Sequence, residues 1–108
     1  MEALKYFKQK DAEFAQNYFD KKYAIEFCKD LYDCGAVNVE IVYEYDEDEE
    51  EIYADTMIVT LPKDLAKRTN VIATMLLTRP DEVSTSTDDN LCEDIDWATV
   101  NKIVLWWD

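Results

Sequence analysis

The sequence predicts a single α+β domain, residues 1–108, in which helices pack on one face of a small antiparallel or mixed three-stranded sheet. Three observations support this fold class. Apolar residues recur at helical spacing in the first third of the chain and again after Pro62. Between these regions the spacing changes to the alternation typical of strands. The chain has 108 residues, 48% of them hydrophobic, which is enough for one core. The expected element order is α-α-β-β-α-β.

Two helices are expected in the first third of the chain. The first covers residues 11–18, where Phe14 and Ala15 begin a helical spacing of apolar side chains. The second begins after Asp20, a residue type that caps helix N-termini. It ends at Gly35, because glycine favours the left-handed conformation that follows many helices. The apolar stripe of this second helix consists of Ala24, Phe27, Cys28, Leu31 and Cys34.

Two strands joined by an acidic turn are expected next. Residues 37–45 alternate apolar and polar side chains, the pattern of a half-buried strand. The run DEDEEE at residues 46–51 interrupts the pattern, and β-branched and aromatic residues resume over residues 52–61. The alternation slips around residues 54–56, which indicates a bulge. The apolar positions of the first strand are Val37, Val39, Ile41, Tyr43 and Tyr45.

A third helix, a loop and a terminal strand complete the expected fold. Pro62 suits the first turn of a helix, and Pro80 follows its end. Residues 81–96 contain seven acids, no base and a Ser/Thr run, which predicts a long acidic surface loop. The apolar run at residues 102–107 predicts a terminal strand that joins the hairpin sheet. The apolar stripe of the third helix consists of Leu65, Thr69, Ile72 and Leu76.

Negative charge dominates the composition and is unevenly distributed. The chain has 25 acids, 11 bases and no histidine, a net charge of -14. Residues 36–61 contain nine acids and no base, and residues 81–108 contain eight acids and one base, whereas residues 62–80 carry a net charge of +3. Phosphate backbones and anionic lipids repel such a chain, so neither direct nucleic-acid binding nor membrane binding is expected.

The acidic segments are interpreted as a directed, anionic recognition surface. Carboxylates two residues apart on a strand lie about 6.6 Å apart, comparable with the spacing of phosphates along a nucleic-acid strand. With the terminal strand beside the hairpin, both acidic segments are expected at one end of the sheet. The ordinary alternative is that the acids only keep the chain soluble and discourage edge pairing. The expected partner-binding residues are Glu40, Glu44, Asp46, Glu47, Asp48, Glu49, Glu50, Glu51, Asp88, Asp89, Glu93, Asp94 and Trp97.

Several chemistries are excluded by residues that the chain lacks. Without histidine, the Ser-His-Asp, Cys-His and zinc-histidine sites cannot form. A single glycine excludes glycine-rich phosphate loops. No catalytic residue, metal site or cofactor is therefore predicted, and the protein is not expected to be an enzyme. Asp46, Asp48 and Glu50 fit the start of a calcium-binding loop, but the required glycine does not follow.

The cysteines and the absence of targeting segments indicate a cytoplasmic protein. The three cysteines are an odd number, which favours a reducing compartment. Cys28 and Cys34 are separated by about 9 Å of helical rise, beyond the reach of a disulfide, and are expected to be apolar packing groups. The sequence contains no apolar stretch of membrane-spanning length and no signal peptide.

These observations predict a non-enzymatic protein-binding domain. The expected function is inhibition of a basic partner, such as a nuclease or another nucleic-acid-binding protein, through a surface that mimics nucleic acid. Immunity proteins, antitoxins and phage anti-defence proteins use such surfaces. An adaptor or structural subunit whose charge only confers solubility is one alternative, and a calcium-responsive module is another. A homodimer stays open, because bases such as Lys63 and Lys67 can pair with acidic segments of a second copy.

Overall fold

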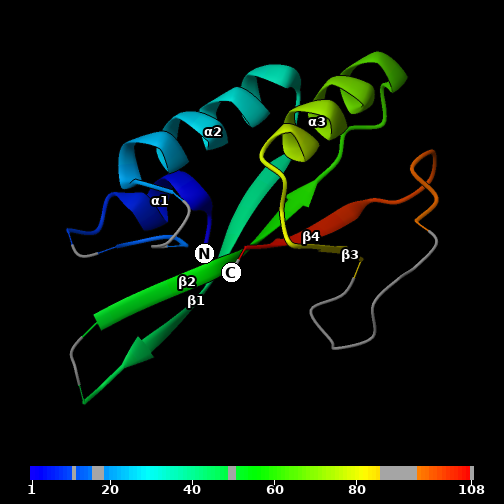
Figure 1. Cartoon of the computed structure of the whole chain (residues 1–108). Helices are drawn as coiled ribbons and strands as arrows, with labels where there is room; N and C mark the ends of the chain where they lie inside the picture. The colour runs from blue at the N-terminus through cyan, green and yellow to red at the C-terminus, as the bar shows by residue number, and fades with distance from the viewer. Residues whose placement is uncertain (11, 16–18, 49–50, 86–94, 108) are drawn as a thin grey trace.

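The computed structural model shows three helices on one side of a four-stranded antiparallel sheet (Figure 1). It describes residues 1–10, 12–15, 19–48, 51–85 and 95–107. The helices are α1 (Ala3–Phe7), α2 (Lys21–Cys34) and α3 (Leu65–Leu77). The strands are β1 (Asn38–Asp46), β2 (Glu51–Thr60), β3 (Glu82–Ser84) and β4 (Lys102–Trp106). The spatial order is β1-β2-β4-β3, and every neighbouring pair is antiparallel.

The sheet has four described strands, one more than the three predicted from the sequence. β3 lies inside residues 81–96, which the sequence predicted as loop, and pairs with β4 through Glu82↔Trp106 and Ser84↔Val104. The backbone N–H of Asp81 also donates to the carbonyl of Trp106 at 2.8 Å. A strand of three residues is too short to display period-two alternation, so only its pairing partner reveals it. The terminal strand itself, β4, pairs with β2 as expected.

The first described helix lies at Ala3–Phe7, earlier than the helix predicted at residues 11–18, of which residues 11 and 16–18 lie outside the described part of the chain. Residues 12–15 are not helical. Ala15 has a φ of 46° and donates its N–H to the carbonyl of Ala54 in β2 at 2.8 Å. Phe14 is buried in the core. The apolar residues at this spacing pack into the core without forming a helix. The backbone N–H of Ala15 bonds to the sheet and not to a carbonyl one helical turn earlier.

The prediction for α2 was confirmed at both ends. The Asp20 carboxylate accepts the backbone N–H of Tyr23 at 2.7 Å, and Gly35 ends the helix with a φ of 114°. This left-handed conformation favours glycine, and a Cβ atom at Gly35 would also lie in a tight contact, 3.0 Å from the Cβ atom of Lys67. Cys28 and Cys34 are free thiols, buried and half-buried respectively. The buried residues of α2 are Ala24, Phe27, Cys28 and Leu31.

The prediction for α3 was right about the helix and wrong about its buried face. Asp64 caps its N-terminus by accepting the N–H of Lys67 at 2.9 Å. The predicted apolar stripe is largely exposed, with Leu65 at 72% and Leu76 at 44% exposure. α3 has a second row of residues at helical spacing, and this row packs against the rest of the structure in place of the predicted one. The buried residues of α3 are Arg68, Val71 and Met75.

The core lies between the helices and the sheet. An aromatic cluster surrounds Trp107, which directly follows β4: Phe14 and Phe19 pack edge-on against it at centroid distances of 5.4 and 5.1 Å. The inward-facing sheet residues are Val39, Ile41, Met57, Val59, Ile103 and Leu105, all buried. None of the described helices lies over the opposite face of the sheet (Figure 1).

Candidate protein-binding surface

The β1–β2 hairpin continues past the end of the other two strands (Figure 1). β4 ends at Trp106, which pairs with Thr56 in β2, whereas β1 and β2 pair on to Asp46↔Glu51. We call residues 43–54 the distal hairpin; residues 49 and 50 lie outside the described part of the chain. The distal hairpin therefore has only two strands, and it projects from the four-stranded part of the sheet.

A bulge separates the distal hairpin from the rest of β2. The register changes from Val42↔Thr56 to Tyr43↔Ala54, so Asp55 has no partner residue in β1. This bulge confirms the sequence prediction for residues 54–56. The Asp55 carboxylate accepts hydrogen bonds from the hydroxyls of Tyr53 at 3.1 Å and Thr56 at 3.0 Å. These bonds hold one carboxylate beside a tyrosine at the base of the distal hairpin.

Three tyrosines of the distal hairpin are exposed. Tyr43 is 41% exposed, Tyr45 is 56% and Tyr53 is 47%, whereas Val39 and Ile41 on the same strand are at most 1% exposed. The prediction that Tyr43 and Tyr45 continue the buried side of β1 was therefore wrong, as it was for Val37 before the strand. The helices cover only the first half of β1. Tyr43 still contacts Tyr6 of α1, with ring centroids 5.8 Å apart.

Three of the described acidic residues of the hairpin are exposed. Glu44 is exposed on β1, and Glu47 and Asp48 are exposed in the turn that follows. Glu40 is half-buried and accepts a hydrogen bond from the side-chain amide of Asn38 at 2.9 Å. Because residues two apart share a face, Glu40 and Glu44 both lie on the face of the sheet opposite the buried Ile41 and the helices.

Two further hairpin acids, Asp46 and Glu51, are located by the pairing of their backbones. Asp46 ends β1 and Glu51 begins β2, and they form the last pair of the ladder. Glu49 and Glu50 lie outside the described residues. The backbone therefore brings Asp46 and Glu51 together beside Glu47 and Asp48, as the acidic-turn prediction required.

The second acidic segment enters the sheet at Glu82, which pairs with Trp106 and so lies level with Thr56, at the end of β4 nearer the hairpin turn. Four of the seven acids of this segment lie outside the described residues, so the expectation that both acidic segments share one end of the sheet stays a prediction. Ser84, the last residue of β3, pairs with Val104, and β4 begins at Lys102 opposite Thr60, the end of β2 that is distant from the hairpin turn. This placement follows from the antiparallel order, in which β3 runs away from the hairpin turn. The predicted residues Asp88, Asp89, Glu93 and Asp94 lie outside the described residues.

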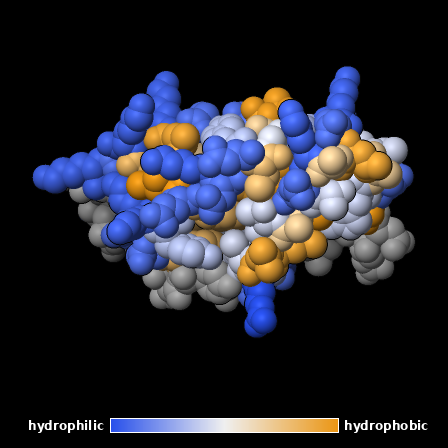
Figure 2. Space-filling model, turned by 90° about the horizontal axis from the view of Figure 1, so that it is seen from above, coloured by the Kyte–Doolittle hydropathy of each residue, from blue (hydrophilic) through white to orange (hydrophobic). Residues whose placement is uncertain are grey.

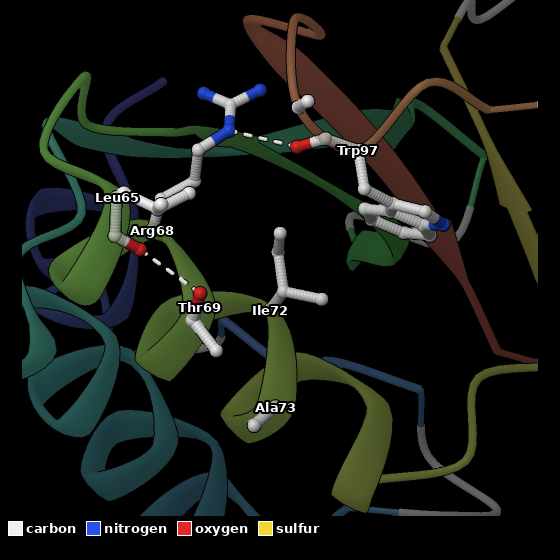
Figure 3. A pocket seen from close by; sticks show the side chains of 7 residues that line it. Leu65, Arg68, Thr69, Ile72, Ala73 and Trp97 are labelled. Carbon is white, nitrogen blue, oxygen red and sulfur yellow. Dashed lines mark hydrogen bonds between the residues drawn. The ribbon is translucent and has the colours of Figure 1, made fainter.

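Trp97, the aromatic residue among the predicted partner-binding residues, lies near α3 and Arg68. It is half-buried, and its carbonyl accepts a hydrogen bond from Nε of Arg68 at 2.8 Å. The same buried guanidinium donates to the carbonyls of Pro62, at 3.1 Å, and Val100. Arg68 thus ties the start of α3 to the segment that leads into β4 (Figure 3).

An open, mainly apolar pocket of about 390 Å³ lies between Trp97 and the exposed flank of α3. In Figure 3, the Trp97 ring lies across the pocket from Ile72. Viewed from the helix side, hydrophilic side chains dominate the surface, with hydrophobic areas between them (Figure 2). Sequence reasoning missed this pocket because it assigned the α3 stripe to the core. The pocket is lined by Leu65, Arg68, Thr69, Ile72, Ala73, Trp97 and Ala98.

The buried cysteine of α2 is poorly suited to nucleophilic chemistry. Burial raises the pKa of the Cys28 thiol to about 12, and the negative charge of Glu2 adds to the effect. A thiol with this pKa stays protonated at neutral pH, whereas nucleophilic cysteines act as thiolates.

No protein-family model, curated protein or solved structure matches the chain. Within the described ranges, no group of three or more His, Cys, Asp or Glu side chains could hold a metal ion. No helix in that part of the chain is long and apolar enough to cross a membrane. Any functional interpretation therefore rests on the surface of this molecule alone.

Proposed function

We propose that this protein is a non-enzymatic inhibitor of a basic protein, such as a nuclease or another nucleic-acid-binding protein. The observation that carries the proposal is the distal hairpin. It projects beyond the sheet and combines exposed carboxylates, such as Glu44 and Glu47, with exposed tyrosines, such as Tyr45. No base occurs anywhere between residues 36 and 61.

The two kinds of side chain serve different parts of binding. Carboxylates attract the Lys and Arg side chains of a nucleic-acid groove over distance, which raises the association rate and makes it salt-dependent. Tyrosines bury large, rigid apolar surface at low entropic cost and are enriched among residues that dominate interface energies. A narrow projecting hairpin of this composition fits a groove that evolved to hold a nucleic-acid strand. Immunity, antitoxin and phage anti-defence proteins are the settings that use such inhibition.

A pair of charge-matched triple variants tests the proposal. The variant Glu44→Gln/Glu47→Gln/Asp48→Asn removes three exposed hairpin charges, and Glu26→Gln/Asp30→Asn/Asp33→Asn removes three exposed charges from α2. The wild-type protein is used to capture partners from a lysate, and each identified nucleic-acid-binding protein is assayed for nucleic-acid binding or cleavage.

We expect the wild type and the α2 variant to inhibit the captured protein, and the hairpin variant to lose at least about tenfold in affinity. Raising the salt concentration should release the partner from the wild type. The proposal fails when both variants inhibit equally well, or when no basic partner is captured at low salt.

An adaptor or structural subunit is the second candidate, and the exposed flank of α3 favours it. Leu65 and Leu76 on this flank are 72% and 44% exposed, and Leu65 borders the apolar pocket beside Trp97. An adaptor that used this flank would keep its partner at high salt, because apolar contacts are not screened. The substitution Leu65→Ser would then reduce capture, and the hairpin triple variant would not.

A further inference from the structure

β1 is an edge strand whose outward backbone groups belong to alternate residues. Among the described strands, β2 alone pairs with it, on one side. On the other side, the N–H of Val39 donates to the Tyr32 hydroxyl at 3.0 Å, and the N–H of Ile41 donates to the carbonyl of Met1 at 2.7 Å. Since backbone direction alternates along a strand, Tyr43 and Tyr45 also point their N–H and C=O groups outward.

The first half of this edge already carries an added segment. Met1 donates its amino group to the carbonyl of Ile41 at 3.0 Å, and Glu2 forms an antiparallel bridge with Glu40. The Glu2 carboxylate also accepts the Tyr32 hydroxyl at 2.6 Å, which holds the segment in place. The edge of β1 therefore accepts an extended strand in its observed conformation.

The second half of the edge is unpaired within the described residues. The outward N–H and C=O groups of Tyr43 and Tyr45 have no protein partner there. An incoming strand could form up to four backbone hydrogen bonds with these groups, without displacing any contact described here. The exposed rings of both tyrosines would pack against its side chains.

The charge around this edge selects the kind of strand that fits. Glu44 lies between the two tyrosines, and Glu47 and Asp48 follow in the exposed turn. Opposite charges on neighbouring strands are favourable and like charges are not. We propose that the free edge of β1 at Tyr43 and Tyr45 binds an extended basic segment of the partner by β-strand addition. This inference rests on the proposed function, because it assigns a binding mode to the same hairpin.

A second copy of this chain is the less favourable occupant. Two β1 edges pairing with each other would bring Glu44 and the turn carboxylates of both copies together, on molecules that each carry a net charge of -14. Acids on an edge strand also protect against edge-to-edge aggregation. Repulsion between carboxylates disfavours pairing with another acidic edge. A basic strand, which these carboxylates attract, is therefore the favoured partner.

Amide hydrogen exchange of the full chain tests the proposal directly. The probe is a peptide of about ten alternating Lys and Val residues, which has the length and pattern of a strand. The amides of Tyr43 and Tyr45 should exchange quickly in the free protein and at least about tenfold more slowly with saturating peptide. The amide of Glu44 points toward β2 and serves as the internal control. The proposal is overturned when the peptide does not bind, or binds without slowing these two amides.

A pair of substitutions at one position provides the second test. Tyr45→Pro removes an outward N–H that the β1–β2 ladder does not use, and Tyr45→Val removes the ring and keeps the N–H. We expect the proline variant to bind the peptide at least about tenfold more weakly than the valine variant, with circular dichroism confirming that both fold. Equal affinity of two folded variants contradicts strand addition. A misfolded proline variant leaves the hydrogen-exchange result on the wild type as the deciding measurement.

These outcomes separate the binding mode from the function. When the hairpin charge variant loses its partner but Tyr43 and Tyr45 show no protection, the proposed inhibitor stands and strand addition fails. Sedimentation that shows a dimer of the free protein, with both amides protected, overturns the proposal in favour of a second copy.

Discussion

The two halves of the β1–β2 hairpin share one sequence pattern and differ in almost every structural respect. In the proximal half, Val39 and Ile41 are buried under the helices, and the edge is paired by the N-terminal segment. In the distal half, Tyr43 and Tyr45 occupy the same alternating positions but are exposed, and the edge is unpaired in the described chain. The difference teaches that alternation predicts a strand and its two faces, whereas the elements packed over a face decide whether it is core or binding surface.

Truncation of one side chain in each half should give the largest contrast. Ile41→Ala should lower the free energy of unfolding by about 2–5 kcal/mol, because it leaves a cavity in the core. Tyr45→Ala should change it by no more than about 0.5–1 kcal/mol, because its ring is 56% exposed. Urea denaturation of both variants measures the contrast. A large loss at Tyr45 would show that the distal hairpin belongs to the cooperative core.

Removal of the Glu2 charge should have an intermediate effect, confined to the proximal half. Burial raises the pKa of Glu2, but hydrogen bonds from the Tyr32 hydroxyl and from backbone N–H groups of α1 outweigh it, so the pKa lies below its usual 4.5. A carboxylate with a lowered folded-state pKa contributes stability above pH 4.5 that is lost as the pH falls through the folded value.

We therefore expect Glu2→Gln to lower the free energy of unfolding by about 1 kcal/mol at neutral pH. The difference from the wild type should shrink as the pH falls below 4.5. Urea denaturation over a pH series measures it, with Glu26→Gln on the exposed face of α2 as the matched control for losing one charge. A difference that is independent of pH would mean that the Glu2 charge does not stabilise the N-terminal segment.

Neutralising the distal carboxylates should have the smallest effect on stability, and the opposite sign. The variant Glu44→Gln/Glu47→Gln/Asp48→Asn has less self-repulsion among carboxylates. At low salt its free energy of unfolding should therefore rise by no more than about 0.5 kcal/mol, with a slightly higher melting temperature. The gain should shrink near 0.15 M NaCl, where the Debye length is about 8 Å. Thermal unfolding at several salt concentrations measures it, and a loss of stability would show that favourable contacts of these acids outweigh their mutual repulsion.

Local chemistry explains which elements the sequence predicted well. The boundaries of α2 were predictable because Asp20 and Gly35 act on the backbone within a few residues of themselves. The bulge at Asp55 was predictable because it interrupts the alternation itself. The acidic turn of the hairpin was predictable for the same reason, since DEDEEE separates two alternating runs.

Long-range contacts explain what the sequence could not show. The buried face of α3 depends on Arg68, whose guanidinium reaches carbonyls about thirty residues away in the chain, at Trp97 and Val100. The strand β3 exists through its pairing with β4. The pairing of Met1 and Glu2 with β1 depends on Tyr32 of α2 and on residues of β1, which lie 30 to 40 positions later in the chain, and no spacing pattern indicates it.

The sequence alone determined the α+β class, the caps of α2, the hairpin with its bulge, and the confinement of negative charge to two segments, because each depends on neighbouring residues. Only the tertiary structure decided that part of the second segment forms the strand β3, that the distal tyrosines stay uncovered, and that half of the β1 edge is already paired. These outcomes depend on which surfaces the helices and the chain ends cover, and that choice is made by packing between residues far apart in the sequence.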